Sequence, residues 1–247
     1  MPALGDGISG VWAWPSEGAQ PAAPRYGLAD ACAYLLFGFD AARAGRRDLV
    51  HARLIGPRMK PFLIDDRPRL CVGVRFAPGF VQAAFGLPAS EFLDERVEYD
   101  LVYSDAAADL ESIRAAVTDA ERVALILALA RRRFRAATRV PSSLRVAVAH
   151  IVAADGNVRV GSLVDRIGVT RQHLARQFAA HVGMTVKQFA RVKRAEAART
   201  RAVAARAAYA RNVPWSTIAH QVGYYDQAHL IRDFKALTGS TPGQWIR

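Results

Sequence analysis

Residues 162–185 read SLVDRIGVTRQHLARQFAAHVGMT, and residues 217–241 read TIAHQVGYYDQAHLIRDFKALTGST. The two stretches share the pattern H-L-x-R-x-F-x-x-x-x-G-x-T, which begins at His173 in the first stretch and at His229 in the second. An internal repeat of this kind determines the architecture of the region that contains it. We therefore expect two copies of one helical motif in the carboxyl-terminal part of the chain.

Each copy has the sequence pattern of a helix-turn-helix. A short apolar segment ends at a glycine, which suits the left-handed residue that follows many helices. Thr170 and Asp226 then supply side-chain oxygens that can cap a second helix. On the second helix of the first copy, Leu174 and Phe178 are four residues apart and face the core together.

The opposite face of each second helix carries an arginine, Arg176 in the first copy and Arg232 in the second. A helix with an apolar underside and an exposed arginine fits the major groove of DNA. Arginine can donate two hydrogen bonds to guanine O6 and N7, worth ~1–3 kcal/mol of base discrimination. The alternative is that both arginines form ion pairs within the protein or solvate its surface. Their repetition at the same phase favours base recognition.

Residues 185–209, between the two copies, are rich in alanine and arginine, which are both strong helix formers. They predict one long helix that joins the two motifs and offers basic side chains to phosphates. The alternative is an exposed helix without a partner. The charge distribution favours a polyanion as partner, because residues 141–247 hold 16 Lys and Arg against 5 Asp and Glu, whereas residues 1–140 hold 18 against 17.

Residues 141–247 resemble the DNA-binding domain of the AraC/XylS family of bacterial transcription regulators. The segments that carry the resemblance are WSTIA (215–219), GYYD (223–226), RDFK (232–235) and GSTP (239–242). The resemblance implies seven helices with two helix-turn-helix units. It also implies that the protein binds a double-stranded promoter sequence-specifically in two successive major-groove segments, with RNA polymerase as a further expected partner.

The resemblance also implies which residues contact DNA. The positions that face bases are Gln172, Ala175 and Arg176 in the first unit and Ala228, His229 and Arg232 in the second. The phosphate contacts are expected from Arg171, Lys193, Arg194 and Lys235. The complete set of expected DNA-binding residues is Thr170, Arg171, Gln172, His173, Arg176, Lys193, Arg194, Gln227, His229, Arg232 and Lys235.

The sequence departs from the family pattern in three ways, one of which is that Ala195 and Arg201 replace apolar positions of the joining helix. Ala228 stands where the family usually has serine, and His229 where it usually has tyrosine. The segment from Arg194 to Ile218 is also longer than the family pattern, by roughly six residues; in a helix these would turn the second unit by ~240° and shift it ~9 Å. Either the excess loops out around residues 208–213, or the two DNA half-sites are unusually spaced.

The amino-terminal half, residues 1–140, reads as β-rich with helices after the strands. Strands are expected around Trp12 and Trp14 and over residues 31–39, 49–55 and 70–76, followed by helices over 109–117 and 120–137. Short strands separated by turns fit a small barrel or sandwich. The helix at 120–137 is apolar over much of its circumference, so it packs either on the barrel and a second copy of the chain or only within one core.

This half is similar to the sensory domain of one actinobacterial-type branch of the same regulators. The segments that carry the similarity are GP (56–57), GVRF (73–76), PG (78–79) and GLPAS (86–90). The similarity implies a cupin-like fold that binds a small effector or forms a homodimer. The expected fold is therefore α+β, with an effector-binding or dimerisation domain over residues 1–140 and a DNA-binding domain over residues 141–247.

The remaining residues exclude several classes of protein. We expect no catalytic or metal site and no cofactor, because Cys32 and Cys71 are the only cysteines and His51 is the only histidine before residue 141. A DNA-repair alkyl-transfer protein, which needs a cysteine nucleophile in a zinc cluster, is an improbable alternative. An architectural DNA-binding protein without an effector is another. We see no secretory signal and no apolar run near the ~20 residues that span a bilayer, so we expect a cytoplasmic protein. Because no catalytic site is expected, we also expect that the protein is not an enzyme.

Overall fold

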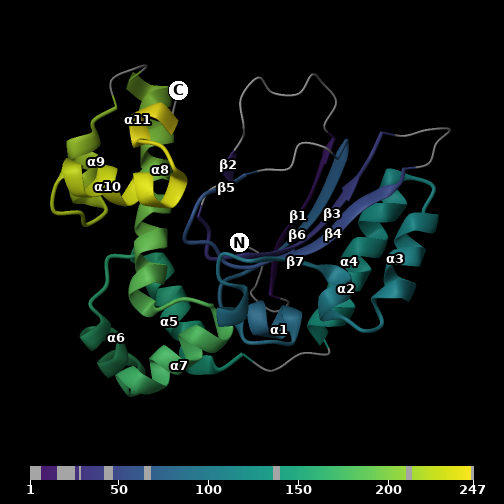
Figure 1. The fold of residues 1–247 in the computed structure, drawn as a ribbon. Helices are drawn as coiled ribbons and strands as arrows, with labels where there is room; N and C mark the ends of the chain where they lie inside the picture. Colours follow the sequence, from purple (N-terminus) through teal and green to yellow (C-terminus); the bar gives the residue numbers. More distant parts are fainter. Residues whose placement is uncertain are drawn as a thin grey trace.

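The computed structural model describes residues 7–15, 26–27, 29–41, 47–63, 68–135, 140–209 and 213–245. These residues form an amino-terminal part built on an antiparallel sheet and a carboxyl-terminal part made of helices (Figure 1). The α+β class and the order of a β-rich part before an all-α part are therefore confirmed. None of the helices in these ranges is long and apolar enough to cross a bilayer.

The sheet of the amino-terminal part has five strands in the order β1-β6-β3-β4-β7, and every neighbouring pair is antiparallel. The strands are β1 (Ile8–Pro15), β3 (Ala33–Phe39), β4 (Leu49–Ile55), β6 (Leu70–Phe76) and β7 (Arg96–Glu98). A separate pair joins β2 (Tyr26–Gly27) to β5 (Phe62–Leu63). The predicted strands at 49–55 and 70–76 coincide with β4 and β6, and the strand predicted around Trp12 and Trp14 is β1.

One face of the sheet is covered by α3 (Ala106–Ala115) and α4 (Asp119–Arg135) (Figure 1). Phe37 of β3 and Val72 of β6 are fully buried against this layer, where Ile126 of α4 also lies. This contact is the amphipathic packing expected of a helix with one apolar stripe. The other side of α4 exposes small and charged side chains, among them Ala124, Ala128 and Arg131.

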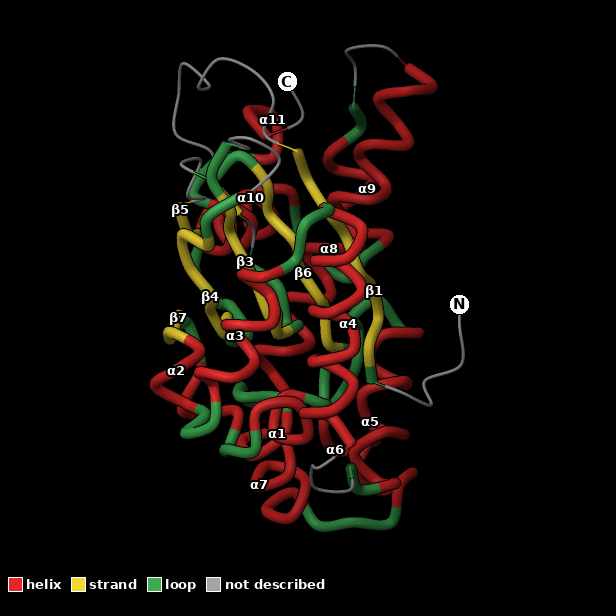
Figure 2. Tube along the Cα trace, turned by 90° about the vertical axis from the view of Figure 1, so that its right-hand side faces the viewer, coloured by secondary structure: helices red, strands yellow, loops and turns green. Residues whose placement is uncertain are grey.

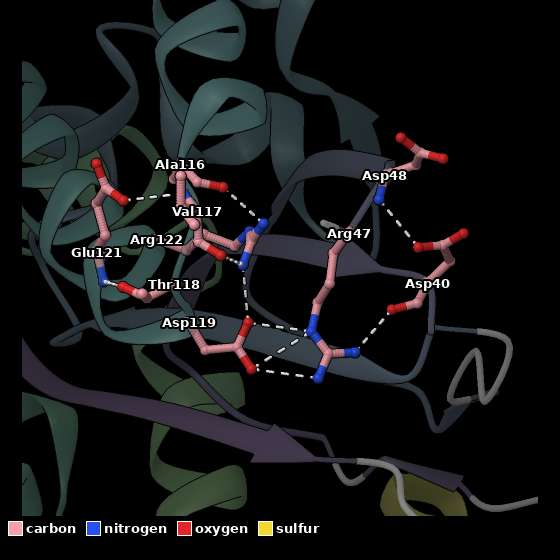
Figure 3. A network of polar contacts seen from close by, with 9 residues as sticks. All are labelled: Asp40, Arg47, Asp48, Ala116, Val117, Thr118, Asp119, Glu121 and Arg122. Atoms are coloured by element: carbon pink, nitrogen blue, oxygen red, sulfur yellow. Dashed lines mark hydrogen bonds and ion pairs between the residues drawn. The ribbon is translucent and has the colours of Figure 1, made fainter. Parts of the chain in front are cut away.

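A polar network fixes the start of α4 (Figure 3). The Arg122 side chain is only 1% exposed and donates hydrogen bonds to the carbonyl of Ala116 at 2.7 Å and to the carboxylate of Asp119 at 2.9 Å. Arg47 donates to the same carboxylate at 3.0 Å and to the carbonyl of Asp40 at 2.8 Å. The network therefore ties the amino-terminal end of α4 to the connection between β3 and β4.

Short elements that the sequence did not predict lie between the sheet and the carboxyl-terminal helices. They are α1 (Val81–Phe85), the 3-10 helix η1 (Ala89–Phe92) and α2 (Tyr99–Val102). Figures 1 and 2 both show α1 close to α7 (Arg171–His181) of the carboxyl-terminal part, and η1 contacts α7 as well. The two parts of the chain are thus in direct contact.

The carboxyl-terminal part contains the seven helices that the resemblance implies, within the described residues. They are α5 (Ser142–Ala153), α6 (Val160–Ile167), α7, α8 (Val186–Tyr209), α9 (Trp215–Gln221), α10 (Gln227–Thr238) and α11 (Pro242–Trp245). The predicted joining helix is α8, which begins after Thr185. The Thr185 hydroxyl accepts a hydrogen bond from the Gln188 amide at 3.2 Å, and Gln188 Oε1 accepts one from the Thr185 amide at 2.8 Å. Such a reciprocal pair satisfies the free amides at a helix start.

Candidate nucleic-acid interface

The first helix-turn-helix unit consists of α6, a short turn and α7. Helix α6 ends at Gly168, whose φ of +73° is accessible to glycine at little cost and whose amide donates to the carbonyl of Val164 at 2.9 Å. Helix α7 begins after Thr170, whose hydroxyl accepts the amide of His173 at 3.1 Å. The glycine stop and the threonine cap that the sequence predicts are therefore confirmed.

Helix α7 has a buried face and an exposed face. Leu174 and Phe178 are fully buried, and the ring of Phe178 lies edge-on to the ring of Phe189 with their centroids 5.7 Å apart. The exposed side chains are Arg171, Gln172, His173, Ala175 and Arg176. The structure therefore brings the predicted DNA-contacting residues of this unit together on one solvent-facing surface.

Sequence reasoning missed Gln177, which orients one of these residues. The Ser143 hydroxyl of α5 donates to Gln177 Oε1 at 3.0 Å, and Gln177 Nε2 lies 2.8 Å from His173 Nε2. The imidazole of His173 is therefore tied through Gln177 to α5. A four-residue spacing between the two side chains on one helix is the signal that could have predicted this contact.

The second unit consists of α9, a turn and α10. The Asp226 carboxylate accepts the amide of His229 at 2.7 Å and caps α10, as the sequence predicts. Leu230 and Phe234 are buried at the positions that correspond to Leu174 and Phe178. The exposed side chains of α10 are Gln227, Ala228, Arg232 and Lys235.

His229 differs from the other predicted contacts because it is only partly exposed. Its ring lies edge-on to that of Tyr224, with centroids 5.0 Å apart, and its Nε2 lies 3.9 Å from the Asp233 carboxylate. The same carboxylate forms an ion pair with Arg191 of α8 at 2.9 Å. His229 thus belongs to a contact set between α8 and α10, and less of its ring is available to DNA than its position in the sequence suggested.

Lys193 and Arg194 do not lie on the exposed surface that the phosphate-contact prediction requires. Lys193 is 8% exposed, because it faces the core side of α8, where its ammonium pairs with Glu196 at 2.9 Å and lies 5.5 Å from the centre of the Phe189 ring. Arg194 donates to the carbonyl of Gly156 at 3.1 Å and lies over the Tyr224 ring. Both cations therefore have partners within the protein, and their contact with phosphates stays a prediction.

The longer segment between the units includes the far end of α8. Helix α9 packs against α8 through Ala197, Ala198 and Ala202, where Ile218 and Ala219 complete the core of the second unit. Ala205, one turn further along α8, is also packed against this core, and α8 continues to Tyr209 with Val203 and Ala204 exposed. The second unit is therefore in contact with α8 over most of its carboxyl-terminal half. Residues 210–212, part of the predicted loop-out, lie outside the described residues.

Arg176 and Arg232 form no ion pair within the part of the chain that the structure describes, and both are exposed. The same holds for Arg171 and Lys235. The contrast with Arg191 and Arg194, which have partners within the protein, separates two classes of basic residue in this region. The unpaired class is the one able to contact an external anion.

The described residues provide no support for a cysteine-based or metal-based reaction. Cys32 is almost fully buried, and burial raises the pKa of its thiol well above the ordinary value, which disfavours the nucleophilic thiolate. No group of three or more His, Cys, Asp and Glu side chains within the described ranges has the arrangement of a metal site. The raised pKa of the buried Cys32 thiol opposes this residue as the nucleophile of an alkyl-transfer reaction.

His181 gives the stability of this region a specific pH dependence. It is buried at the end of α7, and burial lowers its pKa below the ordinary value of 6.5. The unfolded chain therefore takes up this proton at a higher pH than the folded chain, so stability is full above pH 6.5 and declines as the pH falls below it. We expect urea unfolding at pH 7.5 and 5.5 to show a larger loss for the wild type than for His181→Gln.

The exposed His220 supplies the control for this prediction, because its substitution removes a histidine from the surface of the same part of the chain. The His220→Gln variant is expected to retain the wild-type dependence on pH. If His181→Gln and the wild type lose the same free energy of unfolding between the two pH values, burial of His181 is not the cause.

Comparisons with known proteins agree with this geometry. Residues 163–247 match a family described as a helix-turn-helix domain, and residues 2–98 match a domain of unknown function, DUF6597. A search of curated proteins gives no match. The two family matches fall on the all-α part and on the sheet-containing part respectively.

Solved structures are similar to the chain at low identity. ToxT from Vibrio cholerae is 8% identical over 96% of each chain, with a TM-score of 0.49. The C-terminal domain of AraT, a response regulator from Geobacillus stearothermophilus, is 22% identical over 44% of this chain and 88% of its own, with a TM-score of 0.39. The xylose-binding transcription activator xylR is 19% identical over 44% of this chain and 27% of its own, with a TM-score of 0.36.

Proposed function

We propose that this chain is an AraC-type helix-turn-helix transcription regulator, in which α7 and α10 read base edges in two successive major-groove segments of a promoter. Arg176 and Arg232 contact bases, and guanine is the base that a bidentate arginine favours. Arg171 and Lys235 contact phosphates. Regulators of this family are not enzymes, so binding to DNA is the biochemical activity to be measured.

The observation that carries this proposal is the equivalence of the two units. Each second helix starts with a side-chain cap, buries a leucine and a phenylalanine four residues apart, and exposes an arginine without an internal carboxylate partner. The remaining members of the DNA-facing set are Thr170, Gln172, His173, Gln227 and the partly exposed His229. Two similar DNA-facing surfaces on one chain are expected to bind a DNA site that contains two blocks of specific sequence.

A selection experiment tests this proposal. The full chain is incubated with a random duplex library, and we expect enrichment of two sequence blocks about one helical turn apart, or roughly 10 base pairs. With four or five exposed cations at phosphates and bases, log K should fall with log salt at a slope of roughly −4. Absence of enrichment together with weak binding at low ionic strength would refute the proposal.

We further propose that residues 1–140 sense a small molecule. The sheet face opposite α3 and α4 supports this, because cross-strand neighbours place Trp12, Leu36 and Gly73 together there, and the adjacent Trp14 is 55% exposed. A ligand-dependent rise in thermal stability with a change in DNA affinity would support sensing. An architectural DNA-binding protein predicts neither change for any ligand.

The exposed side of α4 supports a proposed homodimer through the amino-terminal half, since Ala124 and Ala128 allow close approach of a second helix. Contact with RNA polymerase, which regulation of a promoter requires in some form, also stays a proposal. Sedimentation of the purified chain with and without its selected duplex would distinguish one bound copy from two.

A further inference from the structure

The amino-terminal part is packed against the core of the first helix-turn-helix unit. Ala29 and Ala31, which precede β3, are buried in the same apolar cluster as Leu144, Leu174 and Phe189. Met59 and Leu93 lie at the edge of that cluster. This cluster therefore contains side chains from both halves of the chain and is not a core of the carboxyl-terminal helices alone.

The contact with the first unit continues at the end of α7. A Cβ atom added to Gly183 would lie 2.6 Å from the carbonyl oxygen of Ala89 in η1, so the two backbones meet more closely than any other residue would permit. Gly183 also has a φ of +81°, in the region that favours glycine. The position of η1 relative to the first reading helix is therefore tightly constrained.

The amino-terminal part also contacts the second unit. The Ala29 amide donates to the carbonyl of Leu237 near the end of α10, at 3.0 Å, and Pro61 lies 3.3 Å from the Cβ position of Gly239. We call the residues Ala29, Ala31, Met59, Pro61, Ala89 and Leu93, together with the helices they touch, the interdomain interface.

The loops that form this interface are themselves fixed. The Asp30 carboxylate accepts hydrogen bonds from the Tyr34 hydroxyl, from the Cys32 amide at 2.9 Å and from Arg75 at 3.2 Å. The carbonyl of Asp30 accepts the Arg58 amide at 2.7 Å, which joins the loop before β3 to the loop before β5. The two contact loops are thus bound to the sheet and to each other.

The interface leaves the DNA-facing side chains uncovered. Arg171, Gln172 and Arg176 at the start of α7 are exposed while η1 contacts its end, and Gln227 and Arg232 of α10 are exposed while Ala29 contacts its end. A contact that covered the reading surface would block binding, whereas this one is compatible with it.

We propose that the interdomain interface fixes the separation and rotation of the two helix-turn-helix units, so that the base-pair spacing which the protein accepts is set partly by residues outside both units. This inference rests on the proposed function. The units have largely separate cores joined by α8, and they touch directly where Asn157 lies against Gly223 and where Leu237 of α10 joins the cluster of the first unit. The amino-terminal part adds a further connection, because Ala29 and Ala31 lie in that cluster and the Ala29 amide bonds to Leu237. A rigid double connection allows both units to engage DNA together only at a matching spacing.

The first test measures spacing tolerance on duplexes selected by the wild type. One inserted base pair moves the second block by ~3.4 Å and ~34°. We expect this insertion to weaken wild-type binding about tenfold, because simultaneous engagement is lost. The double variant Met59→Ser/Leu93→Ser, which weakens the interface, should lose less than about threefold on insertion, since freer units adjust to the new spacing.

The matched control is Leu49→Ser/Val97→Ser, which makes the same change at partly buried residues of the core between sheet, α3 and α4. It should keep the tenfold penalty of the wild type. If the interface variant also keeps that penalty, α8 and the direct contacts between the two units fix their spacing without the amino-terminal part, and our inference is wrong. If neither the wild type nor any variant binds a duplex, the proposed function is wrong, and the inference that rests on it is wrong as well.

A reversible cross-link provides a second test, in which the oxidised and reduced forms of one variant are compared, so that the strain of a cysteine at Gly239, whose φ is +79°, is present in both forms. The Cβ position of Gly239 lies 3.6 Å from the Cβ of Pro61, within the range of disulfides. We expect oxidised Pro61→Cys/Gly239→Cys to bind the reference duplex within about twofold of its reduced form, because the closed interface is the binding form. A loss of binding on oxidation that reductant restores would show that the two parts must separate, and would overturn the inference.

Discussion

Replacement of Arg176 or Arg232 by alanine is expected to weaken binding to the selected duplex by about 1–3 kcal/mol, which is roughly 5- to 150-fold in Kd. Each arginine is exposed, has no carboxylate partner in the described residues and projects from the face opposite a buried leucine and phenylalanine. The loss should fall on the selected sequence, while binding to unrelated duplex changes little. Fluorescence anisotropy with both duplexes measures the two constants.

Two further variants separate base recognition from phosphate contact. Arg171→Ala and Lys235→Ala should weaken binding to all duplexes alike and reduce the salt slope by about one. The control is Arg114→Ala, which removes an exposed arginine from α3 and should leave both constants unchanged. An equal loss on selected and unrelated duplexes for Arg176→Ala and Arg232→Ala would refute base recognition at these positions.

The helices of the carboxyl-terminal part were predictable because their signals are local. A cap such as Thr170 or Asp226, and a glycine such as Gly168 after the last turn, act within a few residues of the helix end that they define. The exposed face of α7 followed from the 3.6-residue period. The DNA-facing residues on α7 and α10 could therefore be placed on their surfaces from the sequence.

The misplacement of Lys193 and Arg194 has a different cause. Their charge suggested solvent, but the buried Lys193 pairs with Glu196 on the same helix, and Arg194 contacts two groups distant in the sequence, the carbonyl of Gly156 and the ring of Tyr224. Long basic side chains can bury their methylene groups while the charged end finds a partner. A helix rich in alanine and arginine has no single apolar stripe, so its period does not show which cations face inward.

The interdomain interface was equally beyond local signals. Ala29 and Ala31 are small residues in a segment without periodicity, and nothing near them in the sequence indicates contact with Leu237, some two hundred positions away. The short elements α1 and η1 begin without a side-chain cap and are too short to show a period, although Gly86 ends α1. Contacts of this kind depend on the shape of the assembled chain.

The repeat offers a direct comparison of two equivalent core positions, Phe178 and Phe234. Both side chains are essentially fully buried, and substitution of either by alanine is expected to cost about 3–5 kcal/mol, from lost transfer energy and the cavity that remains. Phe178 lies in the cluster that includes Ala29 and Ala31, whereas Phe234 lies in the smaller core of the second unit. The two substitutions should therefore destabilise different parts of the chain.

Hydrogen exchange measured by mass spectrometry distinguishes the two outcomes, because it reports local and global opening separately. Phe178→Ala should reduce protection in α5 to α8 and also in the segment around Ala31, since one cluster joins them. Phe234→Ala should reduce protection mainly in α9 to α11 and leave the sheet unchanged. Phe178→Leu and Phe234→Leu, which keep most of the volume, should each cost less than about 1.5 kcal/mol. Loss of the same amides in both alanine variants would mean that the two units and the sheet unfold as one body, so that the separate cores do not act as separate units of stability.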